Sequence, residues 1–321
     1  MTHPLQLINI INYMCLQRKD WVDASKAIGI LLMVAGHSSL PKYLSDWIYS
    51  FHMPLFFILS GYCSSWISEF ISFFKRRTFS IMSYFFIYSL INFLILQLIP
   101  TSFEQKSFCY LITHGWEGFA LWFLPVLYVG QILAFFIKNK YDTYAIILLS
   151  CIAGYLSYHQ IQLPWAASSI PIATTFIVIG RKLKVIINTI LHLSIKKKLI
   201  LLIFTLTLST SISFYVRCDI ANNQILPLIP ILAAGCTGSL FIFLIGNSIV
   251  GFRAATPILR YIGKNTIEVL AFSQIVIIAL NYYEIGYIFK YPIMLSTVCL
   301  FSKIRQAFIS LLKSLMVNRA I

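Results

Sequence analysis

DWVDASKAIGILLMVAGHSSLPKYLSDWIYSFHMPLFFILSGY, residues 20–62, is the stretch that decides the fold class of this chain. Two long apolar runs flank a polar break at residues 38–46. The runs contain ionisable side chains that apolar runs normally exclude: Asp23, Lys26, His37 and His52. A charged group at the centre of a bilayer costs roughly 2.5–3.5 kcal/mol on insertion scales, so such a group marks a functional site by default. The stretch therefore predicts a membrane-embedded helical hairpin that carries a site.

Helical spacing gathers these groups on one side of the first run. At about 100° per residue, the step from Lys26 to His37 leaves them roughly 20° apart around the helix and about 16 Å apart along it. Asp23 lies one turn before Lys26, on the same side. The alternative is a pair of Asp23 and Lys26 near the membrane surface, with His37 as a satisfied histidine of the bundle. We favour the functional interpretation, because an acid, a base and an imidazole share one face.

The composition of the whole chain is that of a polytopic membrane protein. Of its 321 residues, 59% are hydrophobic and only 11% are charged, and the mean hydropathy is +0.82. Soluble domains are about 45–50% apolar and 25% charged. No long polar stretch leaves room for a soluble domain, so we expect one membrane-embedded all-α domain over residues 1–321. The net charge of +15 does not indicate nucleic acid, because the basic residues recur between apolar runs.

The apolar runs predict about ten spanning helices, since a span needs about 20 mostly apolar residues. We expect them at 22–40, 46–67, 79–99, 119–137, 143–158, 164–180, 199–216, 225–247, 266–281 and 287–302. With both termini in the cytoplasm, most of the 25 Lys and Arg residues fall on the cytoplasmic side, as the positive-inside rule requires. Residues 1–20 and 303–321 are then cytoplasmic or interfacial, and the chain is a multi-pass protein of the inner or plasma membrane.

The hairpin resembles the hallmarks of the acyltransferase-3 family of integral-membrane O-acyltransferases. Lys26 with His37 is similar to the family's signature of a basic residue, ten residues and a histidine. SFHMPLFFILSGY at 50–62 resembles the second hallmark, most closely that of the fucose-acetylase-type branch. WFLP at 122–125 and YIGKNT at 261–266 are also similar to family sequences. The chain departs from the pattern by having Lys26 where many members have Arg, and by lacking a histidine in LAFSQ at 270–274.

The resemblance implies an O-acetyltransferase that moves an acetyl group from cytoplasmic acetyl-CoA to a hydroxyl of a surface polysaccharide or lipid-linked sugar. The expected partners are the bilayer, acetyl-CoA as donor substrate and the glycan acceptor, with no bound cofactor, metal ion or nucleic acid. A hydroxyl that attacks a thioester needs a base with a pKa near working pH, which a histidine supplies. His37 is the candidate base or acyl carrier. His52, which the returning second run brings to a similar depth from the opposite end, could face His37 and orient it or act as a second acid–base group. Asp23 and Lys26 complete the candidate catalytic set.

Basic side chains form the candidate donor site. Lys75, Arg76 and Arg77 follow the second run, and with Lys26 they suit the phosphates of coenzyme A. The basic triplet is equally explained as a positive-inside anchor, and both interpretations can hold. Lys26 lies toward the cytoplasm and His37 in the outer half. A donor that enters from the cytoplasm would have to reach from one to the other, so we expect both to line a single water-filled crevice.

The candidate acceptor contacts are Trp116, Glu117 and Trp122. The first two belong to a predicted outer loop, where aromatic and carboxylate groups suit stacking and hydroxyl hydrogen bonds with a sugar. An interfacial aromatic belt with solvated charge is the alternative, and we favour it for Trp122.

Two further features have structural explanations. Asn265 and Glu268 resemble a helix capping box, which accounts for Glu268 without a catalytic role. No Cys-x-x-Cys pair occurs, so a metal or redox motif is not indicated, and a Cys109–Cys218 disulfide is left open.

Two other functions stay open at this point. A proton-coupled secondary transporter could use Asp23, Lys26 and the histidines as a proton relay. It would show pH-dependent flux without release of coenzyme A. The same fold could also transfer a succinyl group instead of acetyl.

Overall fold

The computed structural model describes residues 19–38, 40–66, 69–98, 108–115, 120–252 and 255–285, with isolated positions between 292 and 303. Within these ranges the named elements are all helices, and an Asp219–Gln224 bridge is the extended pairing that occurs there. The predicted all-α class is therefore confirmed for the described chain. The expected segments 1–18 and 304–321 and most of the tenth predicted span lie outside the described residues.

The elements follow the chain in a simple order. The α-helices are α2 (Asp20–Gly36), α3 (Lys42–Cys63), α4 (Phe70–Arg77), α5 (Ser83–Leu98), α6 (Phe108–His114), α7 (Phe123–Phe136), α8 (Asp142–Tyr158), α9 (Ile170–Lys182), α10 (Lys184–Leu191), α11 (Ile195–Ser213), α12 (Leu228–Ile249), α13 (Ala255–Lys264) and α14 (Thr266–Tyr282). The short elements are a π-helix η1 (Thr78–Met82) and 3₁₀-helices η2 (Ala120–Trp122), η3 (Asn139–Tyr141) and η4 (Pro164–Ser169).

The predicted count of about ten spans is not confirmed. Among the described helices, Phe70–Gln97 and Leu228–Ile249 are long and apolar enough to cross a membrane. The number rises to 4 if two bent pairs each count as one span. These pairs are Ala120–Phe136 with Asn139–Tyr158, bent by 103°, and Ala255–Lys264 with Thr266–Tyr282, bent by 78°. Several predicted spans form shorter helices than expected, as α2 does with 17 residues.

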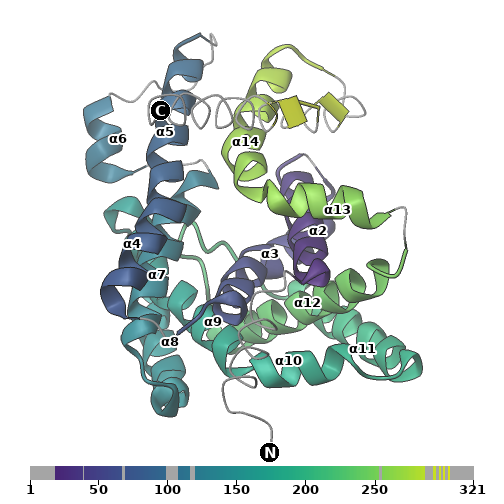
Figure 1. Ribbon diagram of the computed structural model, residues 1–321. Coiled ribbons are helices and arrows are strands. Elements are labelled where there is room, and N and C mark those ends of the chain that lie inside the picture. The colour runs from purple at the N-terminus through teal and green to yellow at the C-terminus, as the bar shows by residue number, and fades with distance from the viewer. Residues whose placement is uncertain are drawn as a thin grey trace, which may run out of the picture.

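The α2–α3 hairpin lies in the middle of the bundle (Figure 1). Helix α3 packs against α9, α12 and α2, and α2 also packs against α12 and α13. In the view of Figure 1, α4, α5, α7 and α8 stand at the left, while α13 and α14 cover the hairpin at the upper right. The stretch that carries the ionisable groups is therefore surrounded by helices from the rest of the chain.

Glycines bring α3 and α9 into close contact. A Cβ at Gly61 would lie 1.9 Å from the carbonyl oxygen of Ile177, and one at Gly180 would lie 2.1 Å from that of Ile58. Small residues allow helix backbones to approach closely where hydrophobic burial cannot drive association. This contact fixes the end of α3 that follows Ser60.

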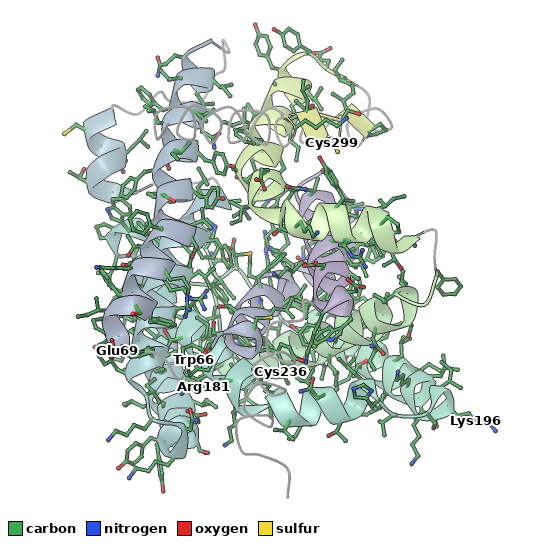
Figure 2. The ribbon with its side chains drawn as sticks, viewed as in Figure 1. Trp66, Glu69, Arg181, Lys196, Cys236 and Cys299 are labelled. Carbon is green, nitrogen blue, oxygen red and sulfur yellow. The ribbon has the colours of Figure 1, made fainter. Side chains whose placement is uncertain are left out.

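A buried ion pair joins α8 to α9. The Arg181 guanidinium contacts the Asp142 carboxylate and donates from Nη1 to the carbonyl oxygen of Ala134 at 2.7 Å. It also lies over the Trp66 ring, 5.0 Å from the ring centroid, and Figure 2 shows both side chains. Because a buried charge is costly unless it is paired, these contacts account for an arginine in this interior position.

Candidate active site

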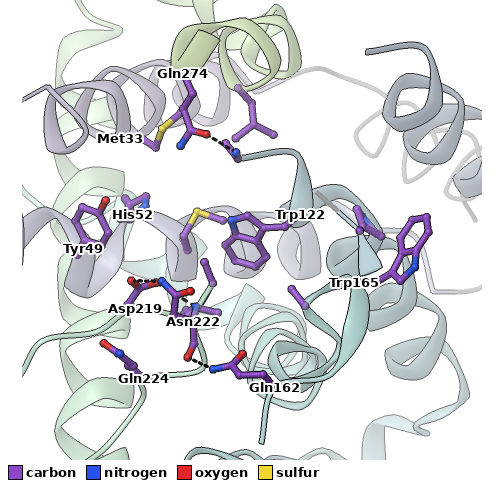
Figure 3. Close-up of a pocket in the computed structure, with 18 of the residues that line it drawn as sticks. Met33, Tyr49, His52, Trp122, Gln162, Trp165, Asp219, Asn222, Gln224 and Gln274 are labelled. Carbon is purple, nitrogen blue, oxygen red and sulfur yellow. Dashed lines mark hydrogen bonds between the residues drawn. The ribbon is translucent and has the colours of Figure 1, made fainter. Parts of the chain in front are cut away.

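A cavity of about 620 Å³ lies beside the end of α2 that carries His37, and we name it the outer cavity after the orientation predicted from the sequence. Its wall is built from α2, α3, the starts of η2 and α7, α14, and the loops around residues 162–166 and 218–224. Figure 3 shows the labelled lining side chains pointing into a common space. Both histidines predicted as catalytic line this cavity, and so does Trp122.

His37 is held at the C-terminal end of α2. The helix ends at Gly36, before the boundary predicted at residue 40, and the backbone N–H of His37 lies 3.2 Å from the carbonyl oxygens of both Met33 and Val34. The backbone of His37 is therefore fixed to the last turn of α2.

Tyr49 connects the two histidines. Its hydroxyl lies 3.0 Å from Nδ1 of His37, and its ring centroid lies 5.0 Å from that of His52. The two imidazole centroids are 6.5 Å apart. The hairpin thus brings together the two histidines that the sequence placed at similar depth, with Tyr49 as a contact that sequence reasoning missed.

The hydrogen bond of His52 defines which ring nitrogen is protonated. Its Nδ1 lies 3.0 Å from the carbonyl oxygen of Ile48, and the side chain is buried, with 4% exposed. A carbonyl oxygen only accepts hydrogen bonds, so Nδ1 carries the proton. In the neutral ring, Nε2 then keeps its lone pair and can accept a proton.

A polar loop between α11 and α12 forms the wall that sequence reasoning overlooked. Asn222 donates from Nδ2 to Oδ2 of Asp219 at 2.9 Å and from its backbone N–H to Oδ1 at 3.3 Å. Gln162 donates from Nε2 to the carbonyl oxygen of Asn222 at 2.6 Å, which ties this loop to the one after α8. The polar run at 219–224 between apolar segments was the signal in the sequence that could have indicated it.

Strained backbone occurs at Trp165 and Ala166, in the neighbouring part of the wall. Trp165 and Ala166 have φ values of 62° and 52°, which non-glycine residues rarely adopt. Gly115, with φ of 84°, packs against Trp165 so closely that a Cβ would lie 2.9 Å from its Cα. Such strain costs about 1–3 kcal/mol per residue and clusters at ligand sites. The predicted contacts Trp116 and Glu117 lie outside the described residues.

A second cavity of about 270 Å³, the inner cavity, contains Lys26 rather than the histidines. Arg77 also lines it and donates from Nη2 to Oγ of Ser64 at 2.8 Å. Its Nε is buried, as is Oε1 of Gln131, and neither atom has a hydrogen-bond partner among the described residues. Unsatisfied buried polar atoms are rare, so these two suit a polar ligand.

The basic triplet separates into one lining residue and two surface residues. Arg77 shares the face of Phe73, one turn earlier, and its guanidinium lies 5.2 Å from that ring centroid. Lys75 and Arg76 are exposed and do not line the cavity. The π-helix η1 begins directly after Arg77, and π-turns inside α-helices are frequent at functional sites.

The single crevice predicted for Lys26 and His37 is wrong, because the two side chains line different cavities. Along α2, Lys26 and Ile30 line the inner cavity, and Met33 and His37 line the outer one. The apolar turn of Ile30 and Met33 is the physical reason for the division. Leu270 of α14 lines both cavities and marks where they approach each other.

Asp23, the remaining predicted catalytic residue, lines neither cavity. Its side chain is buried, and its backbone carbonyl oxygen would lie 2.1 Å from a Cβ at Gly263. Asp23 therefore occupies a closely packed contact between α2 and α13.

The capping-box explanation of Glu268 is wrong, and the disulfide that the sequence left open does not form. Asn265 makes no side-chain capping bond and instead donates from Nδ2 to the carbonyl oxygen of Tyr261 at 2.8 Å. Glu268 is buried, with 1% exposed, and accepts from the Tyr88 hydroxyl at 3.4 Å. Cys109 and Cys218 are free thiols, the first exposed and the second buried, so they do not form a disulfide.

Comparison with known proteins identifies the family. The acyltransferase-3 profile, described as an acyltransferase domain, matches residues 19–303, which include every lining residue of both cavities. No curated protein and no solved structure matches the chain. The profile does not separate branches, so the fucose-acetylase-type assignment stays a prediction, while the apolar helices and the family together indicate a membrane protein. This chain belongs to the acyltransferase-3 family and is an acyltransferase that transfers groups other than aminoacyl groups.

Proposed function

We propose that this acyltransferase moves an acetyl group from cytoplasmic acetyl-CoA to a hydroxyl of a surface polysaccharide or lipid-linked sugar. One observation carries the proposal: two helices run from a cationic cavity to a histidine-containing one. On α14, Thr266 lines the inner cavity, Leu270 lines both, and Gln274 lines the outer cavity. Helix α2 repeats this order from Lys26 to His37. Donor and acceptor can therefore approach from opposite ends and meet near Leu270.

The inner cavity supports the donor half of the proposal. Coenzyme A carries phosphates, and charge-assisted bonds from Lys or Arg to phosphate oxygens are roughly twice as strong as neutral ones. Lys26 and Arg77 supply the charges, and the unpartnered Oε1 of Gln131 can accept from an amide of the pantetheine arm. The cytoplasmic position of this cavity follows from the predicted topology with both termini inside.

The outer cavity supports the chemical step. The acceptor oxygen attacks the thioester carbonyl carbon and loses its proton to Nε2 of a neutral histidine. The carbon–sulfur bond then breaks, and the departing thiolate takes that proton to leave as the free thiol of coenzyme A. His37 is the proposed base, with its Nδ1 bonded to the hydroxyl of Tyr49 at 3.0 Å. His52 then acts as the second acid–base group or holds His37 in position.

Replacing His37 by Ala tests the proposal. A general base contributes about 10²–10⁴-fold, so H37A should reduce ester-linked acetate on the host's surface glycans to background. The matched control is His159→Ala, because His159 is exposed and lines neither cavity. Immunoblots of the membrane fraction establish equal insertion, and unchanged acetylation in H37A overturns the proposal.

The same preparation separates the remaining alternatives. Mass spectrometry of the released acid distinguishes acetyl from succinyl transfer. Coenzyme A release without an acceptor, at one equivalent per protein, would identify His37 as an acyl carrier rather than a base. Family membership already favours acyl transfer over proton-coupled transport, and pH-dependent flux without release of coenzyme A would reverse that preference.

A further inference from the structure

The described wall of the outer cavity has an uneven balance of charge. It contains amides, imidazoles and indoles, a single carboxylate from Asp219, and neither Lys nor Arg. Arg217 lies close in sequence but does not line the cavity. Its side chain is 60% exposed, and its Nε lies 4.0 Å from Oδ1 of Asp46. The fixed charge that faces this cavity is therefore negative.

The uncharged groups of the wall match hydroxyls. Gln162, Asn222 and Gln224 present side chains on one side, and Trp165 lies on another (Figure 3). Amides both donate and accept, as hydroxyls do, and a mostly apolar pocket with a few placed polar groups fixes a ligand's orientation. Packing against Phe85, with ring centroids 5.5 Å apart, and against Gly115 holds the Trp165 ring in place for stacking.

An anionic ligand would meet a different situation here. Its charge would be taken out of water beside the Asp219 carboxylate, with no described cation in the wall to compensate. Like charges at close range in a partly buried site repel by several times more than in bulk water. His37 and His52 do not offset this repulsion, since the base and its partner must be neutral to accept the hydroxyl proton. His114, the third lining imidazole, is exposed, so water and salt screen its interaction with a bound ligand.

We propose that the outer cavity selects an uncharged sugar residue as acceptor and rejects one that carries a carboxylate, with Asp219 as the specificity-determining residue. This inference rests on the proposed function and deepens it, because it assigns the chemical class of the acceptor. It also contrasts with the inner cavity, which is suited to anions.

The test compares pairs of ligands that differ only at C6. Purified protein in nanodiscs is titrated calorimetrically at pH 7.5 with methyl glucoside, galactoside and mannoside and with their matching uronides. We expect saturable binding of at least one neutral glycoside and at least tenfold weaker binding of its uronide. In Asp219→Asn the ratio of glycoside affinity to uronide affinity should fall on the order of tenfold, because the amide keeps the shape of the side chain and removes its charge.

Two further variants keep the test valid if the Asp219→Asn variant does not fold. Gln224→Lys adds a cation at an exposed lining residue, so it should raise uronide affinity without removing a described side-chain hydrogen bond. Glu69→Gln is the matched control, because it removes an exposed acidic group that lines neither cavity, and its discrimination should be unchanged. Melting curves confirm that each variant is folded.

The outcomes separate this inference from the proposed function. Uronides that bind as well as neutral glycosides, or no saturable binding of any glycoside, overturn the inference. Neutral glycosides that bind without any acetyl transfer overturn the proposed function and leave the inference standing. Acetyl transfer to a glycan of uronic acids would overturn the inference and leave the proposed function standing.

Discussion

The two cavities lie along the same helices but differ in the chemistry of their walls. The inner cavity has two cations, Lys26 and Arg77, together with small hydroxyl side chains. The outer cavity has histidines, amides and indoles with one carboxylate among the described residues. A single continuous site would need both sets of groups at one place, where the cations would oppose protonation of the histidines. In the proposed function, division along α2 keeps these cations away from the base that the acceptor needs.

The comparison also explains why α2 carries its ionisable groups so far apart. Lys26 and His37 share a helix face, yet Ile30 and Met33 separate them with an apolar turn. Water that entered from one side would otherwise reach the other and could hydrolyse the thioester. An apolar boundary that only an extended acyl-pantetheine chain crosses would limit this side reaction.

Among substitutions that leave both histidines in place, the largest effect should come from removing the inner cations. Lys26→Met and Arg77→Met should each raise the KM for acetyl-CoA by roughly ten- to a hundredfold, because a hydrogen bond to a charged group contributes about 1.5–3 kcal/mol. The kcat should change less, since the histidines are untouched. Steady-state transfer assays in nanodiscs measure both constants.

Neighbouring basic residues provide the control for this prediction. Lys75→Met and Arg76→Met remove exposed charges that do not line the inner cavity, and each should change the KM less than twofold. An effect of Arg76→Met as large as that of Arg77→Met would contradict the assignment of the donor site to this cavity.

A change at the boundary should have the next largest effect. Leu270→Phe adds volume to the residue that lines both cavities and is buried. We expect kcat to fall about tenfold, because a displacement of the reacting groups by about 1 Å slows the reaction. Neither KM should change much, because each substrate still binds in its own cavity. The measurement is a single-turnover assay with donor prebound. A larger KM for one substrate alone would place Leu270 inside that substrate's site instead.

The central hairpin was predictable because its signals are local. Apolar runs of helical length and ionisable residues within them predicted α2 and α3, and opposite chain directions predicted that His37 and His52 would meet. The number of spans stays a prediction, because hydropathy alone does not distinguish a helix that crosses a membrane from one buried within the protein. Helix α9, for example, has 13 residues and is buried along most of its length.

The parts that were missed depend on helix phase and on contacts between distant loops. Which residue of the basic triplet lines the cavity depends on the start of α4 at Phe70, and neighbouring residues differ by about 100° in direction. The Asp219 wall depends on hydrogen bonds such as Gln162 to Asn222, between loops 60 residues apart in the sequence. Such pairings follow no sequence period, so neither hydropathy nor spacing predicts them.

The smallest effect concerns the link between the two histidines. Tyr49→Phe keeps the ring beside His52 and removes the hydroxyl that bonds Nδ1 of His37. One hydrogen bond contributes about 0.5–1.5 kcal/mol, so kcat should fall about two- to tenfold, with the KM for acetyl-CoA unchanged. We expect an effect on kcat and not on this KM, because Tyr49 lines the outer cavity and not the inner one. If Tyr49→Phe instead weakens donor binding and spares kcat, the histidine pair does not hold the base, and the chemical step belongs elsewhere in the protein.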